Sequence, residues 1–253
     1  MPSSVIPVAM PFVVLGIDTS GSWCSAALIR GSDVFVRRAE VGSAHSDHLL
    51  AMIEAVLDEG GLTLVDCDAL AFAAGPGSFT GLRVGCAVAQ GLAFGAGLAV
   101  APIGTLDAIA RSIRDLDPVT RHTILVAQDA RMGEIYWSLI ARTGDVQHTL
   151  LGPSLAGPEA LRDALRAAPP VDIGCGNAWT LHGDALAGLA SRVVHRETAD
   201  ALDVAELGVL AARAGLLVAA ESAAPVYVRN DVARTTAQRD ADRRRGAAAS
   251  AAA

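Results

Sequence analysis

Two aspartates stand where a carboxylate could act on a phosphate-bearing substrate. Asp18 ends one apolar run and is followed by Thr19 and Ser20. Asp129 ends another apolar run and is followed by a turn that contains Arg131. A carboxylate at a strand end, beside hydroxyls and glycine, can orient a metal-bound phosphate. The alternative, which these residues alone favour, is that the polar side chains satisfy the backbone of two turns.

The turn Gly75-Pro76-Gly77 joins a short apolar run to a stretch of helical length, from Phe79 to about Gly97. Backbone N–H groups at the start of a helix bind anions, so this turn could form a phosphate loop. The spacing argues against both common forms. A dinucleotide fingerprint requires glycine where Thr80 stands, and a Walker loop requires a lysine, which this chain lacks entirely. We therefore predict another role for the glycines.

The helix predicted from Phe79 to Gly97 has one face of small residues. Gly81, Gly85 and Ala89 recur at intervals of four, and such a face lets another helix approach closely. Leucine at Gly85 is expected to block that approach without unfolding the monomer. Arg83 is the only charge on the helix and lies near its start, where the dipole disfavours a cation. Arg83 should therefore have a partner, either in this chain or in another.

His45 and His48 form a candidate metal site at the start of an amphipathic helix that ends near Gly60. Their spacing of three residues could bring both imidazoles to one metal ion. Ser46 and Asp47 fit a helix N-terminus equally well, and no third ligand lies nearby. The capping or interface interpretation is therefore favoured over a metal site.

Composition narrows the class of protein. The chain has 253 residues and a formal net charge of −7, so it should bind a polyanion weakly without a more basic partner. Its four cysteines form no Cys-x-x-Cys pair, and no targeting segment is recognisable, which predicts a cytoplasmic protein. The stretch from Val84 to Leu106 is uncharged, but Gln90, repeated glycines and Pro102 argue against a membrane span.

The elements that must position these residues are repeated. Each half of the chain reads as a strand, an aspartate, a polar glycine turn and further strands, so Asp18 and Asp129 occupy matching places in two similar lobes. The polar segment 115–121, which contains Pro118, is the predicted boundary between the lobes. The predicted organisation is a disordered extension at 1–11, lobes at 12–114 and 115–200, a helix and segment at 201–230 that return to the first lobe, and a disordered tail at 231–253.

The chain resembles the TsaB (YeaZ) family, the non-catalytic subunit of the bacterial machinery that makes N6-threonylcarbamoyladenosine at position 37 of tRNA. The resemblance runs from about Phe12 to Asn230. The stretches that carry it are Ile17 to Ser20, His45 to Leu50, Gly75 to Gly85, Asp129 to Arg131 with Glu134 and Tyr136, and Pro225 to Arg229.

The resemblance implies an α/β chain with the actin-like ATPase (ASKHA) fold, in which two RNase-H-like lobes carry mixed sheets flanked by helices. It also implies a TsaD-type catalytic partner, homodimers when that partner is absent, and a TsaE-type ATPase that joins the pair. The complex would use ATP and magnesium, while this chain would hold no cofactor strongly and would meet tRNA only through the complex. The residues expected at the partner surface are His45, His48, Leu49, Met52, Thr80, Gly81, Arg83, Val84, Gly85 and Val88.

No catalytic or metal-binding residue is expected in this chain. The catalytic paralogue carries a His-x-x-x-His pair on a helix, and the spacing of His45 and His48 does not match it. Asp18, Thr19, Ser20, Asp129 and Arg131 would then mark a degenerate nucleotide cleft. The competing hypothesis is an ATP-dependent sugar or acyl kinase of the same fold, in which Asp18 and Asp129 would serve catalysis.

Overall fold

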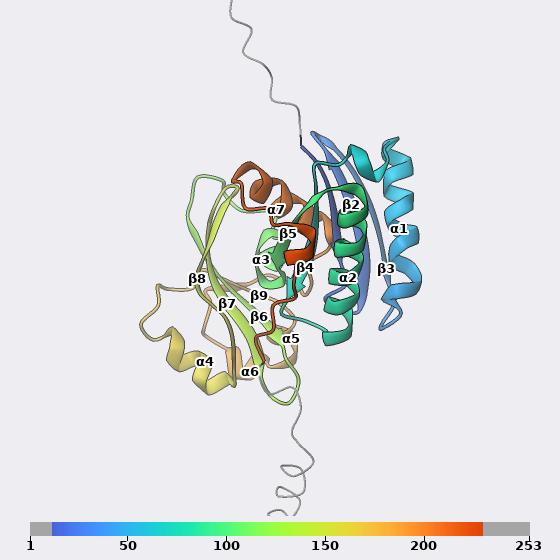
Figure 1. Ribbon diagram of the computed structural model, residues 1–253. Coiled ribbons are helices and arrows are strands. Elements are labelled where there is room, and N and C mark those ends of the chain that lie inside the picture. The colour runs from blue at the N-terminus through green and yellow to red at the C-terminus, as the bar shows by residue number, and fades with distance from the viewer. Residues whose placement is uncertain (1–11, 230–253) are drawn as a thin grey trace, which may run out of the picture.

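A computed structural model describes residues 12–229 of the chain (Figure 1). The predictions of a disordered extension at 1–11 and a disordered tail at 231–253 fall outside the described residues. The first lobe consists of β1 (Val13–Asp18), β2 (Trp23–Arg30), β3 (Asp33–Glu40), α1 (His45–Gly60), β4 (Ala69–Gly75), α2 (Phe79–Ala96), β5 (Ala99–Gly104) and α3 (Thr105–Arg111).

The second lobe follows after the connecting segment 112–121. It consists of β6 (His122–Asp129), β7 (Ile135–Thr143), β8 (Val146–Ala156), α4 (Pro158–Leu165), β9 (Ile173–Cys175), α5 (Ala178–Leu181), α6 (Gly183–Leu186) and β10 (Arg192–Val193). The chain then returns to the first lobe as α7 (Ala201–Arg213).

The two sheets have the same topology, which confirms the repeat predicted from the sequence. Their strand orders are β3-β2-β1-β4-β5 and β8-β7-β6-β9-β10. In each sheet the first three strands pair antiparallel and the last two join in parallel register. This is the predicted actin-like fold of two RNase-H-like lobes.

The helices and sheets form layers (Figure 1), and the residues buried between these layers form three apolar clusters. Helices α3 and α7 lie between the sheets, and their buried residues pack with both, so the lobes share one central cluster. Helices α1 and α2 cover the outer face of the first sheet. The short helices α4, α5 and α6 cover the outer face of the second.

The sequence predicts a final apolar helix from Asp203 to Val218, whereas α7 starts at Ala201 and ends at Arg213. Asp200 caps it, accepting the Leu202 amide through Oδ1 at 2.9 Å. Beyond it, Gly215 has a φ of 69°, and Val218 pairs with Val100 of β5. The predicted helix from 203 to 218 was therefore wrong at its C-terminal end, because the glycine stops the helix.

Candidate functional site

The turn at Gly75–Gly77 is packed against the β1–β2 turn of the same lobe. The Ser78 amide donates a 2.7 Å hydrogen bond to the carbonyl oxygen of Ser20. A Cβ at Gly77 would come within 2.5 Å of that same oxygen. The glycine thus permits a close contact between two backbone segments, and the Ser78 amide is already used in it.

The predicted small face of α2 points into the protein rather than outward. A side chain at Gly81 would overlap the carbonyl oxygen of Thr19, and a Cβ at Gly85 would lie 2.5 Å from the Thr19 hydroxyl oxygen. That hydroxyl donates a 2.7 Å hydrogen bond to the Gly81 carbonyl oxygen. The prediction that a partner helix approaches Gly81 and Gly85 is wrong, because Thr19 of the same chain already fills that space.

Two of the expected partner contacts on α1 are also internal. Leu49 is fully buried in the core beneath α1. His45 is 1% exposed, and its Nε2 lies 3.1 Å from the carbonyl oxygen of Gly21. These two side chains therefore hold α1 on the lobe, and the prediction that they contact a partner is wrong. His48 is exposed and Met52 is half-buried, so both remain accessible.

A second row of small residues on α2 does face outward. Ala87, Gly91 and Gly95 follow Arg83 at intervals of four, and all four are exposed; we call them the outer row. A Cβ at Gly91 or at Gly95 would meet no atom within 4 Å. Sequence reasoning missed this row, although its spacing is the same as that of the internal glycines.

Apolar side chains border the outer row. Phe94 is 76% exposed near the end of the row, and Val84 and Val88 are half-buried along its side. Thr80 is exposed at the start of the helix. The outward face of α2 therefore combines a row of small residues with an exposed aromatic ring, and aromatic residues are enriched at surfaces that contact other proteins.

Arg83 has its partner in this chain. Its guanidinium lies 3.8 Å from the centre of the Phe79 ring, and its Nε donates a 3.1 Å hydrogen bond to the hydroxyl of Tyr227. The two rings are themselves 5.6 Å apart. The stack stays accessible, since Phe79 is 42% and Tyr227 43% exposed. It holds Arg83 in a fixed position at the head of the outer row.

Tyr227 belongs to a C-terminal segment that ties the two lobes together. The amide of Val226 donates to the Ala74 carbonyl at 2.7 Å, at the end of β4. Arg229 then reaches the second lobe, where it donates to the Ala130 carbonyl at 2.8 Å and pairs with Glu134 at 2.8 Å. The segment thus fixes the stack against α2 and braces the β6–β7 turn.

The candidate cleft residues of the first lobe are packed inside it. Asp18 is 5% exposed, and its Oδ1 accepts the Ser20 amide at 2.7 Å. Burial raises the pKa of the Asp18 carboxyl to about 6, partly opposed by the hydrogen bonds from Ser20. Thr19 is buried as well, with its hydroxyl on Gly81. This geometry corresponds to the turn-stabilising alternative.

In the second lobe, Asp129 pairs with a residue that sequence reasoning missed. Its Oδ1 lies 3.0 Å from Nε2 of His182 and accepts the Arg131 amide at 3.2 Å. Asn177 accepts the Asp129 amide at 2.7 Å. Only the matching of the two lobes could have pointed to this region, because His182 follows no recognisable motif. Within residues 12–229, no group of three or more His, Cys, Asp or Glu side chains could hold a metal ion.

The raised pKa of Asp18 predicts a stability effect that depends on pH. A carboxyl whose pKa is higher in the folded than in the unfolded protein stabilises the fold fully below pH 4, and this contribution is lost as the pH rises through about 6. Asp18→Asn keeps the acceptor for the Ser20 amide without the buried charge. We expect the variant to gain on the order of 3 kcal/mol in free energy of unfolding at pH 8, given about 1.4 kcal/mol per pKa unit.

Urea unfolding followed by tryptophan fluorescence at pH 5 and pH 8 measures this effect. The advantage of Asp18→Asn over the wild type should grow between the two pH values. A variant that is less stable than the wild type at pH 8 would show that the ionised carboxylate stabilises this turn.

Known proteins resemble this chain along most of its length. Residues 39–233 match the family model described as TsaD, tRNA N6-adenosine threonylcarbamoyltransferase. The chain is 34% identical over 225 residues to the tRNA threonylcarbamoyladenosine biosynthesis protein TsaB of Escherichia coli, an alignment that covers 87% of this chain and 96% of that protein. The chain belongs to the TsaB family. The TsaB of Haemophilus influenzae is 45% identical over 130 residues, which cover 51% of this chain and 54% of that protein.

A solved structure, YeaZ from Pseudomonas aeruginosa, superposes on this TsaB-family chain with a TM-score of 0.75. The two sequences are 30% identical, and the alignment covers 85% of this chain and 99% of the YeaZ chain. Among the residues that the structure describes, no helix is long and apolar enough to cross a membrane. The uncharged stretch at Val84–Leu106 is instead divided between α2, β5 and the start of α3.

Proposed function

We propose that this chain is a non-catalytic subunit of the machinery for tRNA threonylcarbamoyladenosine biosynthesis, and that it activates a TsaD-type transferase by binding it through the outward face of α2. Two curated relatives carry the name of that biosynthesis, and this supports the pathway. The open outer row of α2, beside the exposed ring of Phe94, supports the docking surface.

The contact residues of this proposal differ from those first expected. Thr80, Arg83, Val84 and Val88 lie on or beside the outward face of α2, and His48 and Met52 are accessible on α1. Ala87, Gly91, Phe94 and Gly95 join them. Small residues let a partner helix approach closely, and the stacked Arg83 enters the contact with little further loss of side-chain entropy.

One surface would serve two partners. In the absence of the TsaD-type subunit, the same face is expected to pair two copies of this chain, because a homodimer across a two-fold axis joins identical patches. A TsaE-type ATPase would join the heterodimer, using ATP and magnesium, and tRNA would be reached through the complex. A cytoplasmic location fits a complex that uses ATP and acts on tRNA.

The kinase alternative requires a carboxylate that faces a metal-bound phosphate. Asp18 is instead buried with its Oδ1 on the Ser20 amide, and Asp129 is engaged with His182. These contacts favour the subunit hypothesis over a phosphotransferase in which the two aspartates bind substrate.

Co-expression with a TsaD-type subunit, followed by size-exclusion chromatography, tests the proposal. We expect the two chains to elute together as a complex of one copy of each, at the expense of the homodimer. Separate elution of two folded proteins would contradict the proposed docking.

A further inference from the structure

A polar cavity of about 440 Å³ lies on the other side of the first sheet from α1 and α2. Its walls come from three separate parts of the chain: β3, the segment that follows α3, and the segment that leads from β10 into the first turn of α7. Each part supplies one arginine, namely Arg38, Arg114 and Arg196. Cavities of this size hold small ligands in other proteins.

The three arginines differ in how fully their donors are used. Arg114 is committed to structure, because its two terminal nitrogens pair with Asp203 and Glu206 at 2.5 Å each. Arg38 reaches Asp200 only at 3.5 Å and otherwise stacks on the ring of Trp23 at 4.7 Å. Among residues 12–229, no carboxylate lies within ion-pair distance of Arg196, which is exposed. Most donors of Arg38 and Arg196 therefore remain free.

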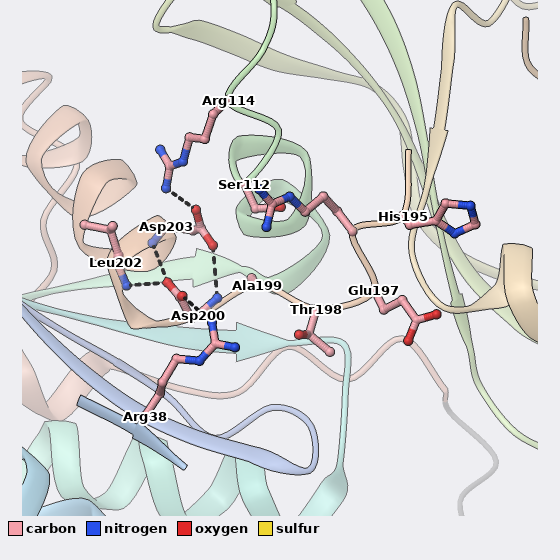
Figure 2. A pocket seen from close by; sticks show the side chains of 11 residues that line it. Arg38, Ser112, Arg114, His195, Glu197, Thr198, Ala199, Asp200, Leu202 and Asp203 are labelled. Atoms are coloured by element: carbon pink, nitrogen blue, oxygen red, sulfur yellow. Dashed lines mark hydrogen bonds and ion pairs between the residues drawn. The ribbon is translucent and has the colours of Figure 1, made fainter. Parts of the chain in front are cut away.

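Unlike most donors of Arg38 and Arg196, the carboxylates around the cavity already accept hydrogen bonds or form ion pairs. Figure 2 shows Asp200 and Asp203 between Arg38 and Arg114, at the start of α7. Asp200 accepts the Leu202 amide through Oδ1 and faces Arg38 through Oδ2, while Asp203 accepts the Asp200 amide at 3.0 Å and pairs with Arg114.

The third carboxylate, Glu197, accepts the hydroxyl of Thr180 at 2.7 Å and is exposed, so water and salt screen its charge. Burial also raises the pKa of the Asp203 carboxyl to about 7, opposed in part by the Asp200 amide and by Arg114. The cavity thus has unused cationic donors on Arg38 and Arg196, while two of its three carboxylates, Asp200 and Asp203, are paired with arginines. It is suited to an anion.

We propose that this cavity binds a small phosphate-bearing ligand, with Arg196 and Arg38 as the donors that contact its phosphoryl oxygens. The planar guanidinium presents paired N–H groups that match phosphate oxygens, and such charge-assisted hydrogen bonds are among the strongest in proteins. Arg114 acts as a positioning residue, since it pairs with Asp203 and Glu206 and offsets their charges beside the ligand. The site does not overlap the outward face of α2, so its existence is independent of the proposed docking.

Calorimetric titration of the full chain with inorganic pyrophosphate, at constant ionic strength and with a chelator to remove divalent cations, tests this site. We expect saturable binding of one equivalent below about 10 mM, the range of a weak specific site. Arg196→Gln should weaken binding at least about tenfold, because one charge-assisted contact is lost. Arg192→Gln is the matched control: it removes the same charge from the neighbouring strand β10, outside the cavity.

The outcomes separate clearly. Loss of binding in Arg196→Gln but not in Arg192→Gln supports the site. Absence of saturable binding in the wild type overturns it, and so does an equal effect of both substitutions, which would reflect net charge alone. Titrations with ADP and with adenosine then identify the source of the phosphate. Stronger binding of ADP than of pyrophosphate indicates a nucleotide. Binding of adenosine without binding of pyrophosphate would overturn the assignment to a phosphoryl group.

Discussion

Gly91→Leu is expected to abolish co-elution with a TsaD-type subunit while the thermal unfolding temperature stays unchanged or rises slightly. Gly91 lies in the middle of the outer row, and a side chain there meets open space. Leucine favours the helix over glycine by somewhat under about 1 kcal/mol, so the isolated chain should not lose stability. A partner helix packed on this row would be pushed away by the width of the side chain, and the close contacts across the interface would be lost.

Gly183→Leu provides a matched control for this experiment. Gly183 opens α6 in the second lobe, and a Cβ there also meets no atom within 4 Å. Size-exclusion chromatography of co-expressed pairs should show the complex with Gly183→Leu and not with Gly91→Leu. Co-elution of both variants with equal yield would place the partner on another surface.

Gly85→Leu is expected to have the opposite effect, because it should destabilise the fold of the isolated chain. A Cβ at Gly85 would lie 2.5 Å from the Thr19 hydroxyl oxygen, and Thr19 is buried with that hydroxyl bonded to Gly81. Overpacking of this kind costs about 1–3 kcal/mol, and displacement of the hydroxyl adds the loss of a buried hydrogen bond, on the order of 1 kcal/mol. The variant should therefore unfold several degrees below the wild type.

The comparison of Gly85→Leu with Gly91→Leu tests the orientation of α2 directly. Differential scanning fluorimetry of the isolated chains should show a lower unfolding temperature for Gly85→Leu alone. If Gly85→Leu were as stable as the wild type, the inner face of α2 would not be packed on Thr19, and the face first expected from the sequence would be free for a partner.

The sequence was sufficient to predict the repeated lobes and the course of α2. The apolar runs before Asp18 and Asp129 predict two equivalent strands, and the largely apolar helix after Gly77 has glycine at its C-terminal cap, as expected for a helix that stops at Gly97. These features depend on local patterns, namely strand hydrophobicity, turn residues and helix caps, which can be recognised without knowledge of the tertiary contacts.

The orientation of α2 could not be predicted in the same way. Two rows of small residues run along this helix, one through Gly81 and Gly85 and the other through Gly91 and Gly95. Both have the spacing that permits close approach, and nothing in the pattern tells which row meets the protein's own backbone. The contact of Thr19 with the first row decides it, and that contact joins residues more than sixty positions apart. His182 and the arginine-lined cavity were missed for the same reason.

In the proposed function, this chain activates a transferase without contributing catalytic residues. The most direct measurement is threonylcarbamoyl transfer to tRNA in a reconstituted reaction containing TsaD-type and TsaE-type subunits, with the wild type, with Gly91→Leu, or without this chain. We predict full activity with the wild type and equally low activity in the other two reactions. Activity that is the same with and without this chain would contradict the proposed function.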